Sequence, residues 1–134
     1  MSYSLTFDVL HRYDPALPGI DVPVVISSGN ETIKTIAKLD TGASLCIFKR
    51  EHGDALGLDI ESGVPQRIGT ATEPFIAYGH NVSLTALGFH FDRMVFFADR
   101  AGFRRNVLGR RGWMERVRLA VVDYEGELYA SKYE

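Results

Sequence analysis

An aspartate follows directly on an apolar, strand-like run in the segment Lys38-Leu39-Asp40-Thr41-Gly42-Ala43-Ser44. A glycine two positions after the acid lets the backbone turn sharply, and the small Ala43 leaves space above the carboxylate. A carboxylate exposed on such a tight loop can exchange protons with water or with a substrate. The same residue types are common in ordinary turns, so the segment alone fits a strand-to-turn junction equally well. We call residues 40–44 the acid loop.

A second segment, Asn106-Val107-Leu108-Gly109-Arg110, lies far downstream of the acid loop. It places two apolar residues before a glycine. That pattern is typical of a buried strand that passes closely beneath another backbone, because a glycine has no side chain to keep the two chains apart.

The elements that must position these segments are short strands. Alternation of apolar and polar residues, interrupted by turn-forming residues, predicts an all-β domain with barrel-like closure and one or two small helices. The expected strands are 22–28, 32–39, 45–48, 64–87 as a long hairpin, 89–98, 106–110, 119–122 and 127–133. A short helix is expected within 49–58, ending near Gly57, and a helical turn within 111–117.

The two segments in this order, separated by a long hairpin, resemble the retropepsin-like aspartic proteases, which include single-domain retroviral proteases and their cellular and bacterial relatives. The resemblance covers roughly positions 20 to 133 and includes Leu56-Gly57-Leu58, which is similar to bacterial members. It implies a closed β-barrel of the acid protease type over residues 21–134. Residues 1–20 are then an N-terminal extension, serving as an extra strand, a dimer element or a prosegment.

The chain contains one Asp-Thr-Gly, whereas the mechanism of this family uses two acids. The resemblance therefore implies a two-fold homodimer in which Asp40 of each copy lies at the axis. Two carboxylates held that close share one proton across a bridging water. The expected activity is that of an aspartic endopeptidase, a hydrolase that cleaves peptides or proteins without a metal or other cofactor.

Carried over residue by residue, the resemblance assigns the site. Asp40, Thr41 and Gly42 are the expected catalytic residues: Thr41 would bond across the axis and Gly42 would offer its carbonyl to the substrate backbone. Substrate contacts are expected from Ala43, Ile68, Gly69, Thr70 and Val107, with residues 68–72 as the tip of a flap. Two features depart from the retroviral pattern: Ser44 and Leu45 replace acids that pair with a later arginine, and Gly69 is the single glycine of the flap.

Composition sets the limits around this interpretation. The chain has 134 residues, 46% of them hydrophobic, with 15 basic and 17 acidic side chains for a formal charge of −2, which indicates one globular domain. A single cysteine, Cys46, excludes an intramolecular disulfide, and we expect it to be a buried, inert thiol. We find no signal peptide or membrane-spanning segment and therefore expect a soluble, cytoplasmic protein.

Other ligand classes have weaker signals. The four histidines, His11, His52, His80 and His90, lack metal-ligand spacing, and His80 and His90 are expected on strand surfaces. Seven arginines between 100 and 118 raise the alternative of nucleic-acid binding, but the near-neutral charge favours a solvated surface or ion pairs with Asp99, Glu115 and Asp123. The main alternative to the protease is a catalytically silent module of the same fold that binds extended peptide or protein segments.

Overall fold

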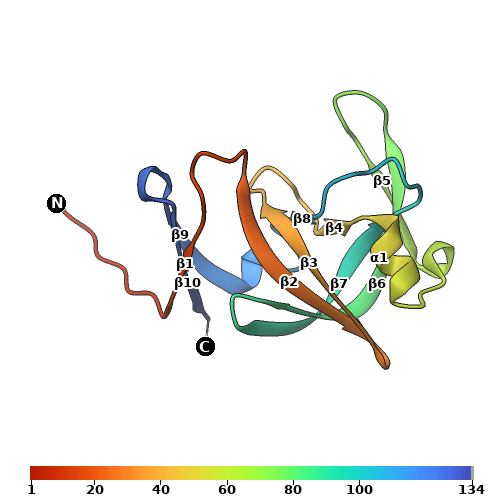
Figure 1. Ribbon diagram of the computed structural model, residues 1–134, viewed down its shortest axis with the longest axis horizontal. Coiled ribbons are helices and arrows are strands. Elements are labelled where there is room, and N and C mark those ends of the chain that lie inside the picture. The colour runs from red at the N-terminus through yellow and green to blue at the C-terminus, as the bar shows by residue number, and fades with distance from the viewer. Residues whose placement is uncertain (134) are drawn as a thin grey trace.

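The computed structural model describes residues 1–133, so residue 134, the last of the predicted domain, lies outside the described residues. The fold is mostly β (Figure 1). Its strands are β1 (Val9–Arg12), β2 (Ile20–Ser28), β3 (Glu31–Leu39), β4 (Ile47–Phe48), β5 (Val64–Ile68), β6 (Phe75–Ala86), β7 (Phe89–Ala98), β8 (Val107–Leu108), β9 (Val117–Val122) and β10 (Glu127–Lys132). The helical elements are α1 (Arg50–Ala55) and short 3₁₀ turns at Ile60–Ser62, Met114–Arg116 and Asp123–Glu125.

The larger sheet has the order β2-β3-β8-β4-β7-β6-β5, and β2 also pairs with β6. The two expected hairpins, 22–28 with 32–39 and the hairpin within 64–87, are confirmed, because β2 pairs with β3 and β5 with β6. Strand β6 also pairs with β7, which sequence analysis expected only as a separate strand, and all three pairings are antiparallel. Sequence alone did not indicate the β2–β6 ladder, which joins Val24 to Ala86. Through this ladder the sheet is strongly curved, and β5 and β6 extend beyond it as a projecting hairpin (Figure 1).

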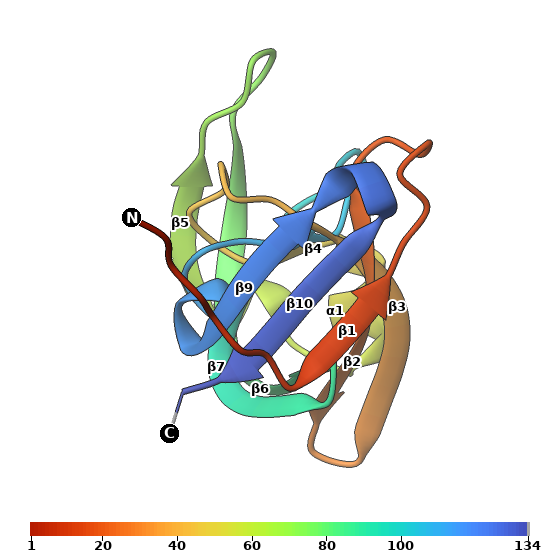
Figure 2. The same cartoon turned by 90° about the vertical axis from the view of Figure 1, so that its left-hand side faces the viewer.

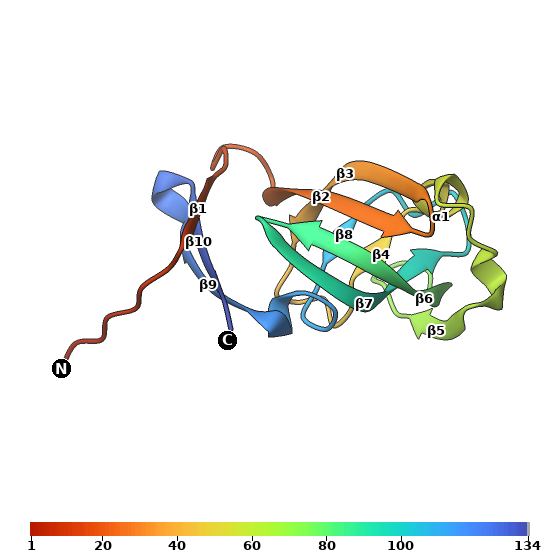
Figure 3. The ribbon, with the colours of Figure 1, turned by 90° about the horizontal axis from the view of Figure 1, so that it is seen from below.

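A smaller sheet with the order β1-β10-β9 lies at one end of the molecule (Figures 2 and 3). Residues 9–12 supply its strand β1, which pairs with β10 over Val9↔Ala130 to Arg12↔Glu127. One face of this sheet buries Leu128 and Ala130 completely in the main core. Ahead of β1, the first residues run in extended form across the other face, where the Phe7 ring lies 6.1 Å from that of Tyr129.

The core confirms the alternation expected for β7. Phe89, Phe91, Val95 and Phe97 are buried, whereas His90 and Asp92 on the other face are exposed. The largest fully buried side chain is Trp113, which belongs to the same apolar cluster as Phe48, Leu108 and Cys46.

The expected helix after β4 is present as α1, shorter than the 49–58 interval. It ends before Gly57, whose φ of +74° is the left-handed conformation that glycine adopts at helix ends. Over residues 1–133, no helix is both long and apolar enough to cross a membrane.

Candidate active site

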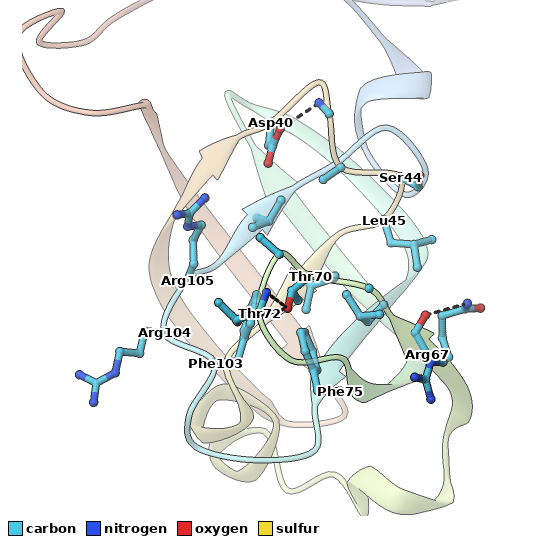
Figure 4. A pocket seen from close by; sticks show the side chains of 18 of the residues that line it. Asp40, Ser44, Leu45, Arg67, Thr70, Thr72, Phe75, Phe103, Arg104 and Arg105 are labelled. Carbon is cyan, nitrogen blue, oxygen red and sulfur yellow. Dashed lines mark hydrogen bonds between the residues drawn. The ribbon is translucent and has the colours of Figure 1, made fainter.

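Hydrogen bonds within the acid loop fix the Asp40 carboxylate. Asp40 follows the last residue of β3, and its backbone N–H donates to the Leu108 carbonyl over 3.0 Å. The Gly42 N–H donates to Asp40 Oδ1 over 2.9 Å, and the Ala43 N–H donates to the Asp40 carbonyl over 3.1 Å. These bonds orient one carboxylate oxygen toward the loop and leave the half-buried side chain facing a cleft (Figure 4).

Strand β8 passes directly beneath this loop, as the apolar-apolar-glycine pattern predicts. It pairs parallel with β3 (Leu39↔Leu108) and antiparallel with β4 (Ile47↔Val107). Beyond β8, the Arg110 N–H donates to the Ala43 carbonyl over 2.9 Å. A Cβ placed on Gly109 would overlap the Leu45 carbonyl oxygen and lie 2.9 Å from that of Ala43. Only a glycine at this position lets the two backbones approach so closely.

Asn106, just ahead of β8, connects β8 to β3 and to α1 through side-chain hydrogen bonds. Its side chain is almost fully buried, and its Nδ2 donates to the Ile36 carbonyl in β3 over 3.1 Å. Its Oδ1 accepts the Lys49 N–H at the start of α1 over 2.9 Å. The same Nδ2 lies 3.1 Å from His52 Nε2 of α1, and burial lowers the pKa of His52. Sequence reasoning treated Asn106 only as the start of a strand and missed this role.

A cleft of about 1060 Å³ lies between the acid loop and the β5–β6 hairpin (Figure 4). Seven of the eight site residues expected from the resemblance border it: Asp40, Gly42, Ala43, Ile68, Gly69, Thr70 and Val107. Thr41, the eighth, is exposed on the acid loop and does not border the cleft. The fold thus brings three distant parts of the sequence, the acid loop, residues 68–70 and Val107, to one cavity.

The hairpin tip is held by its own threonines. Thr70 Oγ1 donates to the Glu73 carbonyl over 2.8 Å and accepts the Thr72 N–H over 3.3 Å. Residues 68–72 therefore form a defined loop over the cleft (Figure 4).

The cleft also contains side chains that the sequence analysis did not single out. Phe75, buried at the start of β6, packs against Phe103 with ring centroids 5.0 Å apart. Arg67 of β5 and Arg105, just before Asn106, border the same cavity. Phe103 and Arg105 belong to a basic segment that was interpreted as a surface loop, and no local pattern indicates that this loop folds back to the acid loop.

The ion pairs expected for the arginines of residues 100–118 were wrong. Arg100 pairs with Glu73 over 3.3 Å, and Glu115 binds Arg93, which lies outside that segment. Arg116 and Arg118 stack on the rings of Phe91 and Phe7. Arg110 forms no ion pair with any residue in 1–133. The other expectation, a largely solvated basic surface, fits the structure.

The remaining candidate groups can be placed individually. Cys46 is fully buried, and burial raises the pKa of its thiol to about 12, which agrees with an inert cysteine. His90 is exposed as expected, but His80 is half-buried with Nε2 2.9 Å from the Ile60 carbonyl oxygen. Among the described residues, no three His, Cys, Asp or Glu side chains gather as a metal site would require.

Comparison with known proteins supports the fold. No family model matches the sequence, and no curated protein matches it. Among solved structures, the chain is similar to the EIAV protease complexed with the inhibitor HBY-793. The two share a TM-score of 0.53 and 20% sequence identity, over 82% of this chain and 88% of the protease. The chain therefore has a retropepsin-like fold.

Proposed function

We propose that this protein is an aspartic endopeptidase that works as a homodimer, in which the Asp40 carboxylates of two copies activate one water. The observation that carries the proposal is the acid loop: a carboxylate fixed by the Gly42 N–H, supported from beneath by β8, at the wall of a cleft large enough for an extended peptide.

In the proposed reaction the ionised carboxylate removes a proton from water as the water oxygen attacks the peptide carbonyl carbon. The protonated carboxyl of the other copy donates its proton to the carbonyl oxygen, which gives a gem-diol. Proton transfer to the amide nitrogen then accompanies cleavage of the C–N bond. The hairpin tip covers the peptide and excludes water, as mobile lids generally do.

The sheet β1-β10-β9 has features that favour it as the surface at which a second copy binds. Among the strands of residues 1–133, β9 pairs only with β10, so its other edge offers unpaired backbone groups. Large apolar side chains are exposed on or next to this sheet: Leu10, Val121, Val122, Tyr124 and Tyr133, each at least 41% exposed. An unpaired edge bordered by exposed apolar residues is the feature that strand pairing between chains uses. We therefore propose this sheet as the interface of the two-fold, closed-barrel dimer.

The test of activity is cleavage of a peptide library between about pH 4 and 8. This range covers the pH values at which two carboxylates that share one proton could catalyse hydrolysis. Asp40→Asn should lower the cleavage rate by about 10²- to 10⁴-fold, because it removes the acid and the base together. Asp59→Asn is the matched control, since Asp59 is exposed and does not border the cleft. Cleavage that survives Asp40→Asn would contradict the mechanism.

One observation favours the silent peptide-binding module. The hairpin tip contains one glycine, Gly69, and is braced by the Thr70 hydrogen bonds, which restrict its closure. A folded dimer that binds peptides at the cleft but leaves all of them intact across the pH range would establish this alternative.

A further inference from the structure

Unpaired guanidinium groups border the cleft. Its lining contains one carboxylate, Asp40, and four cationic residues, Lys38, Arg67, Arg104 and Arg105. The Lys38 ammonium is already bound by Asp21 over 2.6 Å and by the Pro18 carbonyl over 2.9 Å. The three arginines are exposed and form no ion pair with any other residue from 1 to 133.

An acidic group near the cleft is committed elsewhere. Glu73, next to the hairpin tip, pairs with Arg100 over 3.3 Å. The molecule as a whole carries a formal charge of −2, so the cationic character of this cavity is local and opposite in sign to the net charge. A cavity lined by one sign of charge concentrates ligands of the other sign.

Two of the arginines flank an apolar floor. Ala43, Ile47, Phe75 and Val107 are apolar residues of the cleft lining. In Figure 4 the guanidinium groups of Arg105 and Arg67 lie on opposite sides of Phe75, whereas that of Arg104 points away from it. The lining thus combines apolar side chains with two cations that lie on opposite sides of Phe75.

We propose that the cleft selects extended peptides with an apolar centre flanked by acidic side chains, and that Arg67 and Arg105 are the residues that determine this specificity. The planar guanidinium matches a carboxylate through two parallel hydrogen bonds, which gives directional as well as charge selection. The inference rests on the cleft being the peptide site of the proposed function.

The lining favours a peptide over a nucleic acid. Binding of single strands relies on aromatic faces on which bases stack. Phe75 is 6% exposed, with Phe103 against its ring and Arg100 over it at 5.9 Å, so it offers no free face. Phe103, the other aromatic residue of the lining, is half-buried against Phe75, so the cleft offers no row of free rings. An acidic peptide requires only the two flanking cations and the apolar floor.

The experiment measures binding in the Asp40→Asn background, so that it does not depend on cleavage. Three fluorescent octapeptides share an apolar centre and carry Glu, Gln or Lys on both sides, and affinity is read by anisotropy. Partly exposed ion pairs change affinity by about 1.4- to 5-fold each, so we expect the Glu peptide to bind several-fold more tightly than the Gln peptide, and the Lys peptide most weakly.

Three substitutions locate the effect. Arg67→Gln and Arg105→Gln should each lower the Glu-to-Gln affinity ratio by about 1.4- to 5-fold, whereas Arg104→Gln, next to Arg105 in the chain, should leave the ratio unchanged. Raising the salt to about 0.5 M should bring the ratio toward one, because exposed charges are screened.

Equal affinity for the three peptides, a ratio insensitive to Arg67 and Arg105, or an equal dependence on Arg104 would overturn the inference. So would a single-stranded oligonucleotide that binds more tightly than the Glu peptide. If the unsubstituted protein cleaves peptides without preferring acidic ones, the proposed specificity is rejected and the proposed protease activity is retained. If it binds acidic peptides preferentially but cleaves none, the specificity is retained and the protease activity is rejected.

Discussion

At the scale of single residues, the contact between Asn106 and His52 links the site to pH. Burial lowers the pKa of His52 from its ordinary value of 6.5, and the charge of Lys49 lowers it further while that of Glu51 opposes both. A folded-state pKa below the unfolded value means that the unfolded chain takes up the proton first as pH falls. The neutral imidazole also accepts a hydrogen bond from the Asn106 side-chain N–H at Nε2, and a protonated ring has no lone pair there to accept it.

We therefore predict that the free energy of unfolding falls as pH drops below about 6.5 toward the folded-state pKa of His52, and that the contribution is fully present above 6.5. Urea unfolding at several pH values between about 5 and 8 measures this slope. His52→Gln should reduce the slope, and His90→Gln, which changes an exposed side chain, should retain it. An unchanged slope in His52→Gln would assign the effect to other groups.

At the scale of elements, the close passage of β8 under the acid loop depends on Gly109. We predict that Gly109→Ala lowers the free energy of unfolding by about 2 kcal/mol or more, because the new methyl group would overlap the backbone of Leu45. It should also displace the acid loop and abolish any peptide cleavage. Chemical denaturation and a peptide assay measure the two effects.

Gly102→Ala provides the matched control. Gly102 borders the same cleft, but a Cβ there has nothing within 4 Å. Its free energy of unfolding should change by less than about 0.5 kcal/mol. Equal changes in the free energy of unfolding for the two substitutions would mean that the close approach of β8 to the acid loop does not account for the effect of Gly109→Ala.

The elements also show what sequence could and could not predict. The hairpins and the β7 faces follow from alternation within one strand, such as Phe89, Phe91 and Phe97 against His90 and Asp92, so local patterns were enough. The bonds of Asn106 join residues 54 and 70 positions away, and no local pattern encodes them.

The acid loop was predictable because the residues on both sides of the β3–β8 contact carry recognisable motifs. The arginines were not, since an ion pair depends on which acid lies within reach in three dimensions. Arg100 forms an ion pair with Glu73 of the hairpin rather than with Asp99 beside it in sequence. Arg105 lines the cleft. The individual roles proposed for the site residues remain predictions.

At the scale of the whole molecule, the proposed activity requires two copies. We predict that Val121→Asp weakens self-association by about tenfold or more, because it places a charge on an exposed apolar position of β9. Sedimentation over a range of protein concentrations measures the monomer–dimer equilibrium, and peptide cleavage should fall in parallel. Ile36→Asp is the control, since Ile36 is 55% exposed on β3, which has partners on both sides.

A Val121→Asp variant that dimerises as tightly as the unsubstituted chain would remove the β9 edge from the interface. If the same variant also cleaved peptides normally, the two acids would have to meet through another surface.

The ladder between β1 and β10 also sets an order of events during synthesis. Asp8 and Ser131, joined by a hydrogen bond, are 123 positions apart, so β1 leaves the ribosome long before its partner strand exists. At about 5–20 residues per second this delay is about 6–25 s. Every strand of the larger sheet is synthesised before β9 and β10, and Leu128 and Ala130 of β10 then complete the main core. If β9 is the contact between copies, a nascent chain gains the means to pair, and with it the second acid, only after every strand of the larger sheet has been made, which delays proteolysis until β9 has followed them.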